Sequence, residues 1–246
     1  MSDPLRVALV AEGITDFVVL RSAVEAMLHG RSFDMKLLQP EESVAFVGSG
    51  NAGAFGGGWR GVYRWCLQSA ERSGGSFGDD PLFQFYDLII FHLDADVAAE
   101  NPAAYPHAPI LELAGFLPCE QPCRGPAAHP HHTTDRLRRL LLSWSGAERQ
   151  PSQLVLCTPS KATDTWMMAI FFPNDPEMEK AGWECHADPA GRLSQQKKKA
   201  KFKKSYQSYA DRASDITKHW PRIVQTLSEA GRFHEDFLAA VGMIAD

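Results

Sequence analysis

Residues 5–16 read LRVALVAEGITD, an apolar run followed by an acidic turn and the start of an amphipathic helix. The run at residues 5–10 is rich in branched side chains, which is typical of a strand buried on both faces of a parallel sheet. Apolar residues then recur at helical spacing, with Thr15 as the expected N-cap and Gly30 placed to end the helix. The stretch therefore predicts a strand, a sharp turn and a helix.

The same alternation continues along the chain. We expect further strands at residues 43–47, 87–93 and 153–157, and helices at residues 59–70 and 163–172, the last one stopped by the proline that follows it. Strands that alternate with helices indicate βαβ units and a mainly parallel sheet. The predicted fold class is therefore α/β.

Seven prolines between residues 101 and 130 interrupt this pattern. Such a density of proline favours an inserted loop or lid, which we place at about 97–132. A helix should follow, with Thr133 or Thr134 as its N-cap. Its apolar residues should face inward, and its three arginines should face outward; these are Arg136, Arg138 and Arg139.

The C-terminal part differs in composition from the rest of the chain. From about residue 174 an irregular segment leads to a basic stretch at residues 195–204 and then to two or three helices. On this basis we divide the chain into an α/β domain at residues 1–173 and a basic linker with a helical C-terminal region at residues 174–246.

The chain has 246 residues, of which 44% are hydrophobic and 22% charged, as in ordinary globular proteins. With a formal net charge of −5, any attraction of nucleic acid must come from a local basic patch. The five irregularly spaced cysteines argue against a disulfide framework and for a reducing compartment. No signal peptide is visible, and no apolar run approaches the roughly 18 residues that a membrane span needs. We therefore expect a cytoplasmic protein without membrane contact.

Three acidic residues come directly after predicted strands. Glu12 follows the first strand, and Asp94 and Asp96 follow the strand at residues 87–93. The carboxyl ends of parallel strands meet at one edge of a sheet, so these carboxylates should converge there. In an extended Asp-x-Asp both side chains point to one face, and such oxygen ligands suit Mg²⁺ held beside a phosphate. Alternatively, each acid caps the next helix or faces solvent.

Two of these stretches resemble the motifs of a known family. Residues 10–16, VAEGITD, resemble the glutamate motif of Toprim domains, and residues 88–96, LIIFHLDAD, resemble their aspartate motif. The family includes topoisomerases, bacterial primases, recombination proteins and the nuclease half of overcoming-lysogenization-defect proteins. The resemblance covers about residues 5–100, or 5–172 at most. It implies a Toprim-like, Rossmann-like parallel sheet flanked by helices, with the C-terminal helices as an appendage.

The roles of the family's residues carry over to the positions that match its motifs. The resemblance implies that Glu12 serves as acid/base or metal ligand and that Asp94 and Asp96 hold Mg²⁺. Ala98 stands where topoisomerases and primases often carry a further acid, and this departure favours the nuclease branch. Asp16 matches a second acid that is typical of that branch. The other interpretation of Asp16 is an acid in the first turn of a helix, where it stabilises the helix dipole.

The nuclease branch also recruits a later acid and a lysine. Asp164 and Lys161, just after the fourth predicted strand, could supply them, and two metal ions could bind if Asp16 and Asp164 both take part. The alternative is that Thr163 or Asp164 caps the helix that begins there.

Six lysines crowd into residues 197–204 and could neutralise the phosphates of a nucleic acid. They are Lys197, Lys198, Lys199, Lys201, Lys203 and Lys204. Phe202, Tyr206 and Tyr209 lie among or just after them and could stack on bases. The alternative is a solvated basic face with no ligand.

Two other features carry weaker signals. The glycine-rich residues 48–58 match neither common phosphate-binding motif, and they serve either as a flexible surface loop or as a close approach to a phosphate backbone. His92, inside an apolar strand, is expected to be a hydrogen-bonded core histidine. A group of cysteines and histidines does not match the spacing of structural zinc sites, so zinc is not expected; these are Cys119, Cys123, His129, His131 and His132.

The sequence thus predicts a Mg²⁺- or Mn²⁺-dependent nuclease that cleaves phosphodiesters. Stand-alone proteins that resemble Toprim domains at this size are commonly effectors of bacterial anti-phage or toxin systems. The resemblance implies a partner ATPase and allows a homo-oligomer. Since the chain has no ATP-binding motif, any use of ATP would need that partner. Two alternatives stay open: a non-catalytic binding or regulatory subunit of such a complex, and a small-molecule phosphatase or nucleotide-binding α/β protein.

Overall fold

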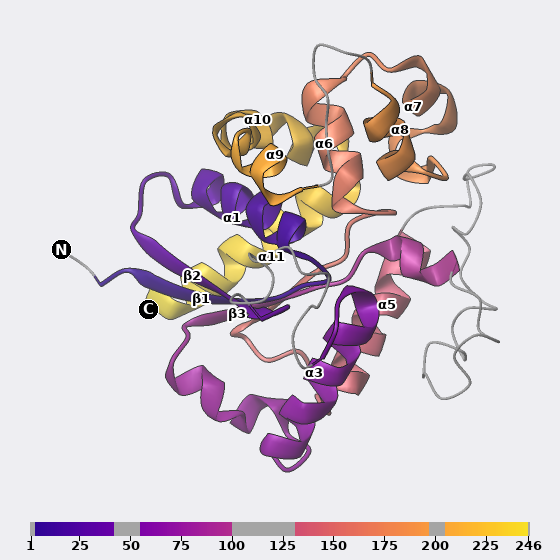
Figure 1. Cartoon of the computed structure of the whole chain (residues 1–246). Helices are drawn as coiled ribbons and strands as arrows, with labels where there is room; N and C mark the ends of the chain where they lie inside the picture. Colours follow the sequence, from indigo (N-terminus) through magenta and orange to yellow (C-terminus); the bar gives the residue numbers. More distant parts are fainter. Residues whose placement is uncertain (1–2, 42–54, 100–130, 197–204, 246) are drawn as a thin grey trace.

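The chain folds as an α/β protein whose parallel sheet lies between two layers of helices (Figure 1). The computed structural model describes residues 3–41, 55–99, 131–196 and 205–245. Within these ranges the sheet has four strands in the order β2-β1-β3-β4, and each neighbouring pair is parallel. The strands are β1 (Leu5–Val10), β2 (Phe33–Gln39), β3 (Leu88–His92) and β4 (Leu154–Cys157).

The strand order reverses between β1 and β3. From β1 the chain passes through α1 (Ile14–Leu28) to β2, and it later crosses through α3 (Gly58–Arg72) to β3 on the other side of β1. In open α/β sheets, ligands bind beyond the carboxyl ends of the strands at such a switch point. The fold therefore singles out the ends of β1 and β3 as the place for a functional site.

Helices cover both faces of the sheet. α3 and α5 (His131–Trp144) cover one face and lie below the sheet in Figure 1. The helices of the other face are α1, α6 (Thr163–Phe171), α9 (Tyr206–Ala210), α10 (Ala213–Thr226) and α11 (Ser228–Ala245). Two short helices, α7 (Pro176–Ala181) and α8 (Pro189–Gln195), follow α6.

The C-terminal helices share the hydrophobic core of the face that α1 covers. Trp166 of α6 lies against Trp220 of α10, with ring centroids 5.2 Å apart, and against Phe233 of α11 at 6.2 Å. Arg222 of α10 donates a hydrogen bond to the carbonyl oxygen of Ala169 at 2.6 Å, near the end of α6. The residues after α6 therefore complete this core and support the helix that begins at the switch-point edge.

β2 lies directly after α1, where the sequence analysis placed no strand. Met35 and Leu37 are buried, while the residues between and before them are exposed. Alternating burial of this kind shows that one face of β2 is covered and the other is exposed. The strand expected at residues 43–47 falls outside the described residues. The strands expected near residues 5–10, 87–93 and 153–157 are confirmed.

Two helices begin earlier than their expected caps. α1 starts directly after Gly13, so Thr15 lies inside the helix and the prediction that it is the N-cap is wrong. α5 starts at His131, so Thr133 and Thr134 are also helical residues. In both helices the apolar residues expected to face inward are buried, although α1 is also buried around most of its circumference. The ends differ because helix ends are the least determined part of such a pattern.

Arg138 lies on the buried side of α5, contrary to the expected outward position. Its guanidinium forms an ion pair with Asp236 of α11, and this partner makes burial of the charge tolerable. The pair joins helices from the two layers. The expected inward residues of α5 are buried as predicted; they are Leu137, Leu140, Leu141 and Trp144.

The three cysteines in the described part of the chain are in two different states. Cys66 and Cys157 are buried free thiols, and burial raises the pKa of both. Cys185 is disulfide-bonded, which the argument from cysteine spacing did not foresee. No helix in the described part of the chain has both the length and the apolar composition needed to cross a membrane.

Candidate metal centre

The two motifs meet where β1 and β3 end. The backbone N–H of Asp94 donates a hydrogen bond to Glu12 Oε1 at 2.7 Å. The start of α3 closes on the same turn, because the N–H of Gly58 donates to the backbone oxygen of Glu12 at 2.9 Å. Gly58 has a φ of +65°, a left-handed conformation that favours glycine, and its Cα faces the Glu12 carboxylate. The last glycine of the glycine-rich stretch therefore borders the site.

Thr163, the first residue of α6, joins two carboxylates that are far apart in sequence. Its hydroxyl donates to Asp16 Oδ1 at 2.7 Å, and its backbone N–H donates to Asp94 Oδ1 at 3.1 Å. The N-cap of α6 is Ala162, so neither Thr163 nor Asp164 has the capping role considered for them. The partial positive charge at this helix N-terminus stabilises the carboxylates beside it. Thr163 thus holds Asp16 of α1 next to Asp94.

His92, the last residue of β3, belongs to the same cluster. Its Nε2 lies 3.1 Å from Asp94 Oδ1, because residues two apart at a strand end point to the same side. The two atoms are close, yet their alignment does not make a hydrogen bond, and neither ring nitrogen has a partner among the described residues. His92 is therefore buried in the core as expected, but the expectation that its ring is hydrogen-bonded is wrong for the described residues.

Asp16, His92 and Asp94 can together bind a metal ion. Each offers one ligand atom, and these three atoms lie within 4.8 Å of one another. Asp16 and Asp94 are almost fully buried and His92 is completely buried. Buried carboxylates that face one another repel, and a cation between them relieves that repulsion.

The electrostatics of the cluster act on Glu12. Only part of this residue reaches solvent, and burial of its carboxyl group raises its pKa well above the usual range. The negative charges of Asp94, Asp96 and Asp16 raise the pKa further, while His92 opposes them. Glu12 therefore keeps a proton more readily than an exposed glutamate does.

Asp96 lies at the exposed rim of this edge. The strand ends at His92, and residues Ala95–Ala99 form a short 3₁₀ helix, so Asp94 and Asp96 do not have the extended alternation that the sequence analysis assumed. The pair that shares one side of the chain is His92 with Asp94. The N–H of Asp96 donates to the backbone oxygen of Lys161 at 2.8 Å, which ties this segment to the loop after β4.

Lys161 and Asp164 are both buried in the loop and helix that follow β4. Lys161 adopts a left-handed backbone with φ of +63°, which is uncommon for a residue other than glycine. Asp164 accepts a hydrogen bond from the phenol of Tyr209 in α9. Burial and the neighbouring Asp164 raise the pKa of Tyr209, and its ring is enclosed, so it is not available to stack on a base.

The C-terminal region fixes the loop that leads to Lys161. Ser160 donates to Glu184 Oε1 at 2.9 Å, and Ser228 at the start of α11 donates to Glu184 Oε2 at 2.7 Å. Glu229, the next residue, is buried and accepts from the Thr134 hydroxyl of α5 at 2.7 Å. Residues from α5, α11 and the segment after α7 therefore hold the strand end that presents Thr163.

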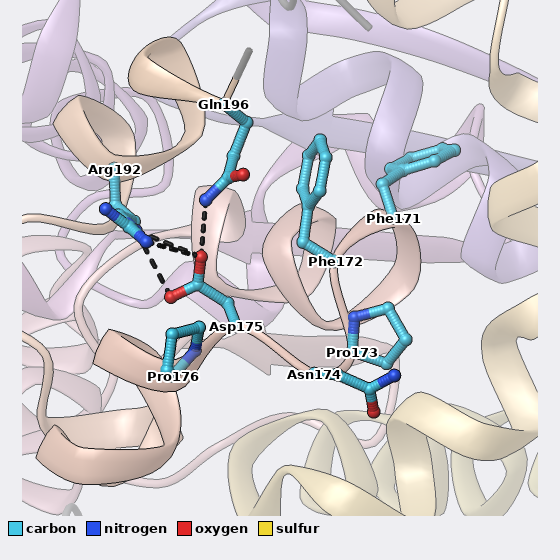
Figure 2. A pocket seen from close by; sticks show the side chains of 8 residues that line it. All are labelled: Phe171, Phe172, Pro173, Asn174, Asp175, Pro176, Arg192 and Gln196. Atoms are coloured by element: carbon cyan, nitrogen blue, oxygen red, sulfur yellow. Dashed lines mark hydrogen bonds and ion pairs between the residues drawn. The ribbon is translucent and has the colours of Figure 1, made fainter. Parts of the chain in front are cut away.

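A separate pocket of about 380 Å³ lies at the other end of α6. Figure 2 shows Asp175 there, with Arg192 and Gln196 directed at its carboxylate. Phe171 and Phe172 line the pocket's apolar side. A helix of nine residues is about 13 Å long, which separates this pocket from the carboxylates at the start of α6.

Several predicted site residues cannot be placed. All six lysines of residues 197–204 fall outside the described residues, and so do the side chains of the cysteine and histidine group considered for zinc. Among the placed residues, Asp94 contacts Glu12 directly, and Thr163 bridges Asp94 to Asp16. The sequence analysis missed the contributions of Thr163 and His92, since a contact across 147 positions, such as that of Thr163 with Asp16, leaves no local signal.

Comparisons of the chain with protein-family models, with curated proteins and with solved structures give no match. The case for a function therefore rests on the geometry of the site and on the two motifs.

Proposed function

We propose that the chain is a metal-dependent phosphodiester hydrolase of the Toprim kind that acts on nucleic acid. One observation carries the proposal. The glutamate motif and the aspartate motif, 82 positions apart, are in direct contact through the hydrogen bond from Asp94 N–H to Glu12 Oε1. This contact lies at the strand switch point, where α/β proteins bind their ligands.

Asp16 and Asp94 are the proposed ligands of a divalent cation, Mg²⁺ or Mn²⁺, with Asp96 nearby at the rim. The fit is supported by two buried carboxylates held side by side through Thr163, since both cations bind carboxylate oxygens. When bound, such a cation polarises a phosphoryl oxygen and offsets the charge that builds up in cleavage. The two hydrogen bonds from Thr163 keep both carboxylates oriented toward the proposed ion.

Glu12 is the proposed proton carrier. Its raised pKa favours the protonated carboxyl group at neutral pH compared with an exposed glutamate. Because Oε1 already accepts the N–H of Asp94, Oε2 is the atom that holds the proton. From Oε2 the proton can pass to the oxygen that leaves phosphorus, a role that typically contributes about 10²–10⁴-fold in rate.

Lysines are proposed to supply the positive charge that offsets the negative charge of the substrate. Lys161, buried in the loop that leads to Thr163, is proposed to offset charge on the departing oxygen. The six lysines of residues 197–204 are proposed to bind the phosphates of the substrate strand. A partner ATPase is proposed on the resemblance to nuclease effectors of anti-phage and toxin systems.

The test is cleavage of single- and double-stranded DNA and RNA in Mg²⁺ or Mn²⁺, with any neighbouring ATPase present. Glu12→Gln should lower the rate by at least about 10²-fold. Glu71→Gln, which changes an exposed acid on α3, should leave the rate unchanged. Equal rates for wild type and Glu12→Gln would remove the proposed proton transfer. Wild type that cuts only nucleotide monoesters would indicate a phosphatase, and wild type that cuts nothing would indicate a docking subunit.

The lysines are tested separately from the chemistry. Changing all six to Gln should weaken nucleic-acid binding and flatten its dependence on salt, because fewer counterions are released. An unchanged affinity and salt slope would leave these lysines as a solvated basic face.

A further inference from the structure

His92 is the one member of the cluster whose chemistry the proposed function leaves unused. Its ring is completely buried, and neither of its nitrogens has a hydrogen-bond partner among the described residues. Buried polar atoms in proteins nearly always have a partner, so each exception calls for an explanation. A buried imidazole that faces two carboxylates is explained if its partner is a metal ion.

The contact with Asp94 does not by itself explain the ring. The distance of 3.1 Å from Nε2 to Asp94 Oδ1 is short enough for an ion pair, but the alignment fails as a hydrogen bond. In addition, Asp94 Oδ1 already accepts the backbone N–H of Thr163. Two ligand atoms of one metal ion also lie this close together without a hydrogen bond between them.

The spacing fits such a common atom. Ligand atoms that lie about 2.0–2.2 Å from a metal are roughly 3 Å apart when they subtend a right angle. The 3.1 Å between His92 and Asp94 matches this value, and the 4.8 Å limit on all three ligand atoms leaves room for Asp16 to complete the set.

We propose that His92 is a metal ligand, which makes Asp16, His92 and Asp94 a mixed nitrogen and oxygen centre that selects a first-row transition-metal ion such as Mn²⁺ over Mg²⁺. Mg²⁺ takes oxygen ligands almost exclusively, whereas an imidazole nitrogen suits transition metals. This inference rests on the metal centre of the proposed function and deepens it, because it names the class of ion. Glu12 stays outside the ligand set, because it is not among the residues whose ligand atoms lie within 4.8 Å of one another.

The arrangement of the chain explains why a histidine can reach the ion. β3 ends at His92, so His92 and Asp94 project from one side of the same segment, and Asp16 comes from the first turn of the helix after the neighbouring strand. Thr163 fixes both carboxylates from the opposite element, α6. Two ligands therefore come from the end of β3 and one from the helix that follows β1, and α6 orients the two carboxylates.

The decisive measurement is made on wild-type full-length chain that has been stripped of metal with a chelator and loaded with Mn²⁺ alone. Pulsed electron paramagnetic resonance should detect coupling of the Mn²⁺ electron spin to a nitrogen nucleus, and the signal should change when histidine alone is labelled with ¹⁵N. Titration calorimetry should give an affinity for Mn²⁺ at least ten-fold above that for Mg²⁺, roughly the effect that even residues one step removed from a metal can have.

Two variants test whether the nitrogen coupled to Mn²⁺ belongs to His92. His92→Phe, which keeps an aromatic ring, and His92→Asn, which is smaller, should both abolish the coupling and bring the Mn²⁺ affinity close to that for Mg²⁺. His219→Phe on α10 is the matched control and should change neither. Thermal melts in chelator show whether each variant is folded, and the ¹⁵N-labelled wild type provides an answer that needs no variant.

The outcomes separate this inference from the proposed function. Bound Mn²⁺ without nitrogen coupling, or coupling that survives in both His92 variants, would overturn the inference and leave a carboxylate centre for the nuclease. Nitrogen coupling in a chain that cleaves no nucleic acid would support the inference and remove the nuclease. A wild type that binds neither ion, or an Asp16→Asn, Asp94→Asn double variant that binds both as before, would overturn the centre that both require.

Discussion

The phenol of Tyr209 donates a hydrogen bond to Asp164, and this contact joins α9 to the first turn of α6. Both residues are buried, so the bond is shielded from water. Tyr209→Phe removes only the hydroxyl. It should lower the free energy of unfolding by about 1.5–3 kcal/mol, the usual range for a hydrogen bond to a charged group. Urea denaturation measures the loss. Tyr63→Phe, in α3 on the other face of the sheet, is the control and should lose less; equal losses would show that the Tyr209 hydroxyl contributes nothing particular.

Gly61 of α3 lies against Gln39 of β2. A Cβ at this position would overlap Gln39 Nε2 and the carbonyl oxygen of Gly56, which are themselves hydrogen-bonded at 2.7 Å. Gly61→Ala should therefore destabilise the protein by about 1–3 kcal/mol, as overpacking does. Gly242→Ala in α11 meets no atom within 4 Å and should instead stabilise by about 0.5–1 kcal/mol through helix propensity. A comparison of the two urea midpoints checks both signs, and a neutral Gly61→Ala would mean that Gln39 can move aside freely.

Asp175 makes stability depend on pH in the acid range. Burial alone would raise its pKa, but hydrogen bonds from Arg192 and from backbone N–H groups outweigh burial and lower the pKa below the ordinary value of 3.8 (Figure 2). A carboxyl group whose pKa is lower in the folded state stabilises fully above its ordinary pKa and loses this effect as pH falls through the folded value. Asp175→Asn should therefore cost stability at neutral pH, and the difference from wild type should shrink below pH 3.8. A difference that stays constant across this range would contradict the argument.

The ionised carboxylate of Glu12 should destabilise the folded state at neutral pH, whereas the ionised carboxylate of Asp175 stabilises it. Folding raises the pKa of Glu12 above the ordinary value of 4.5, so the folded state binds this proton more tightly than the unfolded state. In chelator, wild type should therefore lose stability as pH rises from 4.5 through the raised pKa. Glu12→Gln has no such proton and should show a flatter profile and a higher melting temperature at neutral pH. A melting temperature below wild type would show that the ionised carboxylate supports the fold.

Much of the sheet was predictable from sequence because three of its strands are continuous apolar runs. β1, β3 and β4 are buried throughout or nearly so, and a run of this kind has few other interpretations. β2 was not predicted from the sequence because nearly half of its residues are polar. In addition, its alternating pattern at Phe33–Gln39 begins only a few residues after α1.

The acids of the site were predictable for a similar reason, since a carboxylate directly after a buried strand has a known place in a parallel sheet. Glu12 and Asp94 were found in this way. Local pattern could not reveal His92 as a member of the cluster, because its burial suggested only core packing. The role of Thr163 depends on where α6 begins relative to α1, which is a tertiary relationship with no local signature.

The hydrogen bonds of Glu184 connect the β4 loop to residues that the ribosome adds much later. Ser160 of that loop and Ser228 of α11 both donate to this one carboxylate. A nascent chain that has emerged only as far as α6 thus carries all the acids of the centre without the side chains that hold its last loop in place. Because chains begin to fold from the N-terminus during synthesis, the hydrogen bond from Ser228 to Glu184 can form only after the start of α11 has been made. The acids of the centre are therefore synthesised well before the residue of α11 that helps to fix the neighbouring loop.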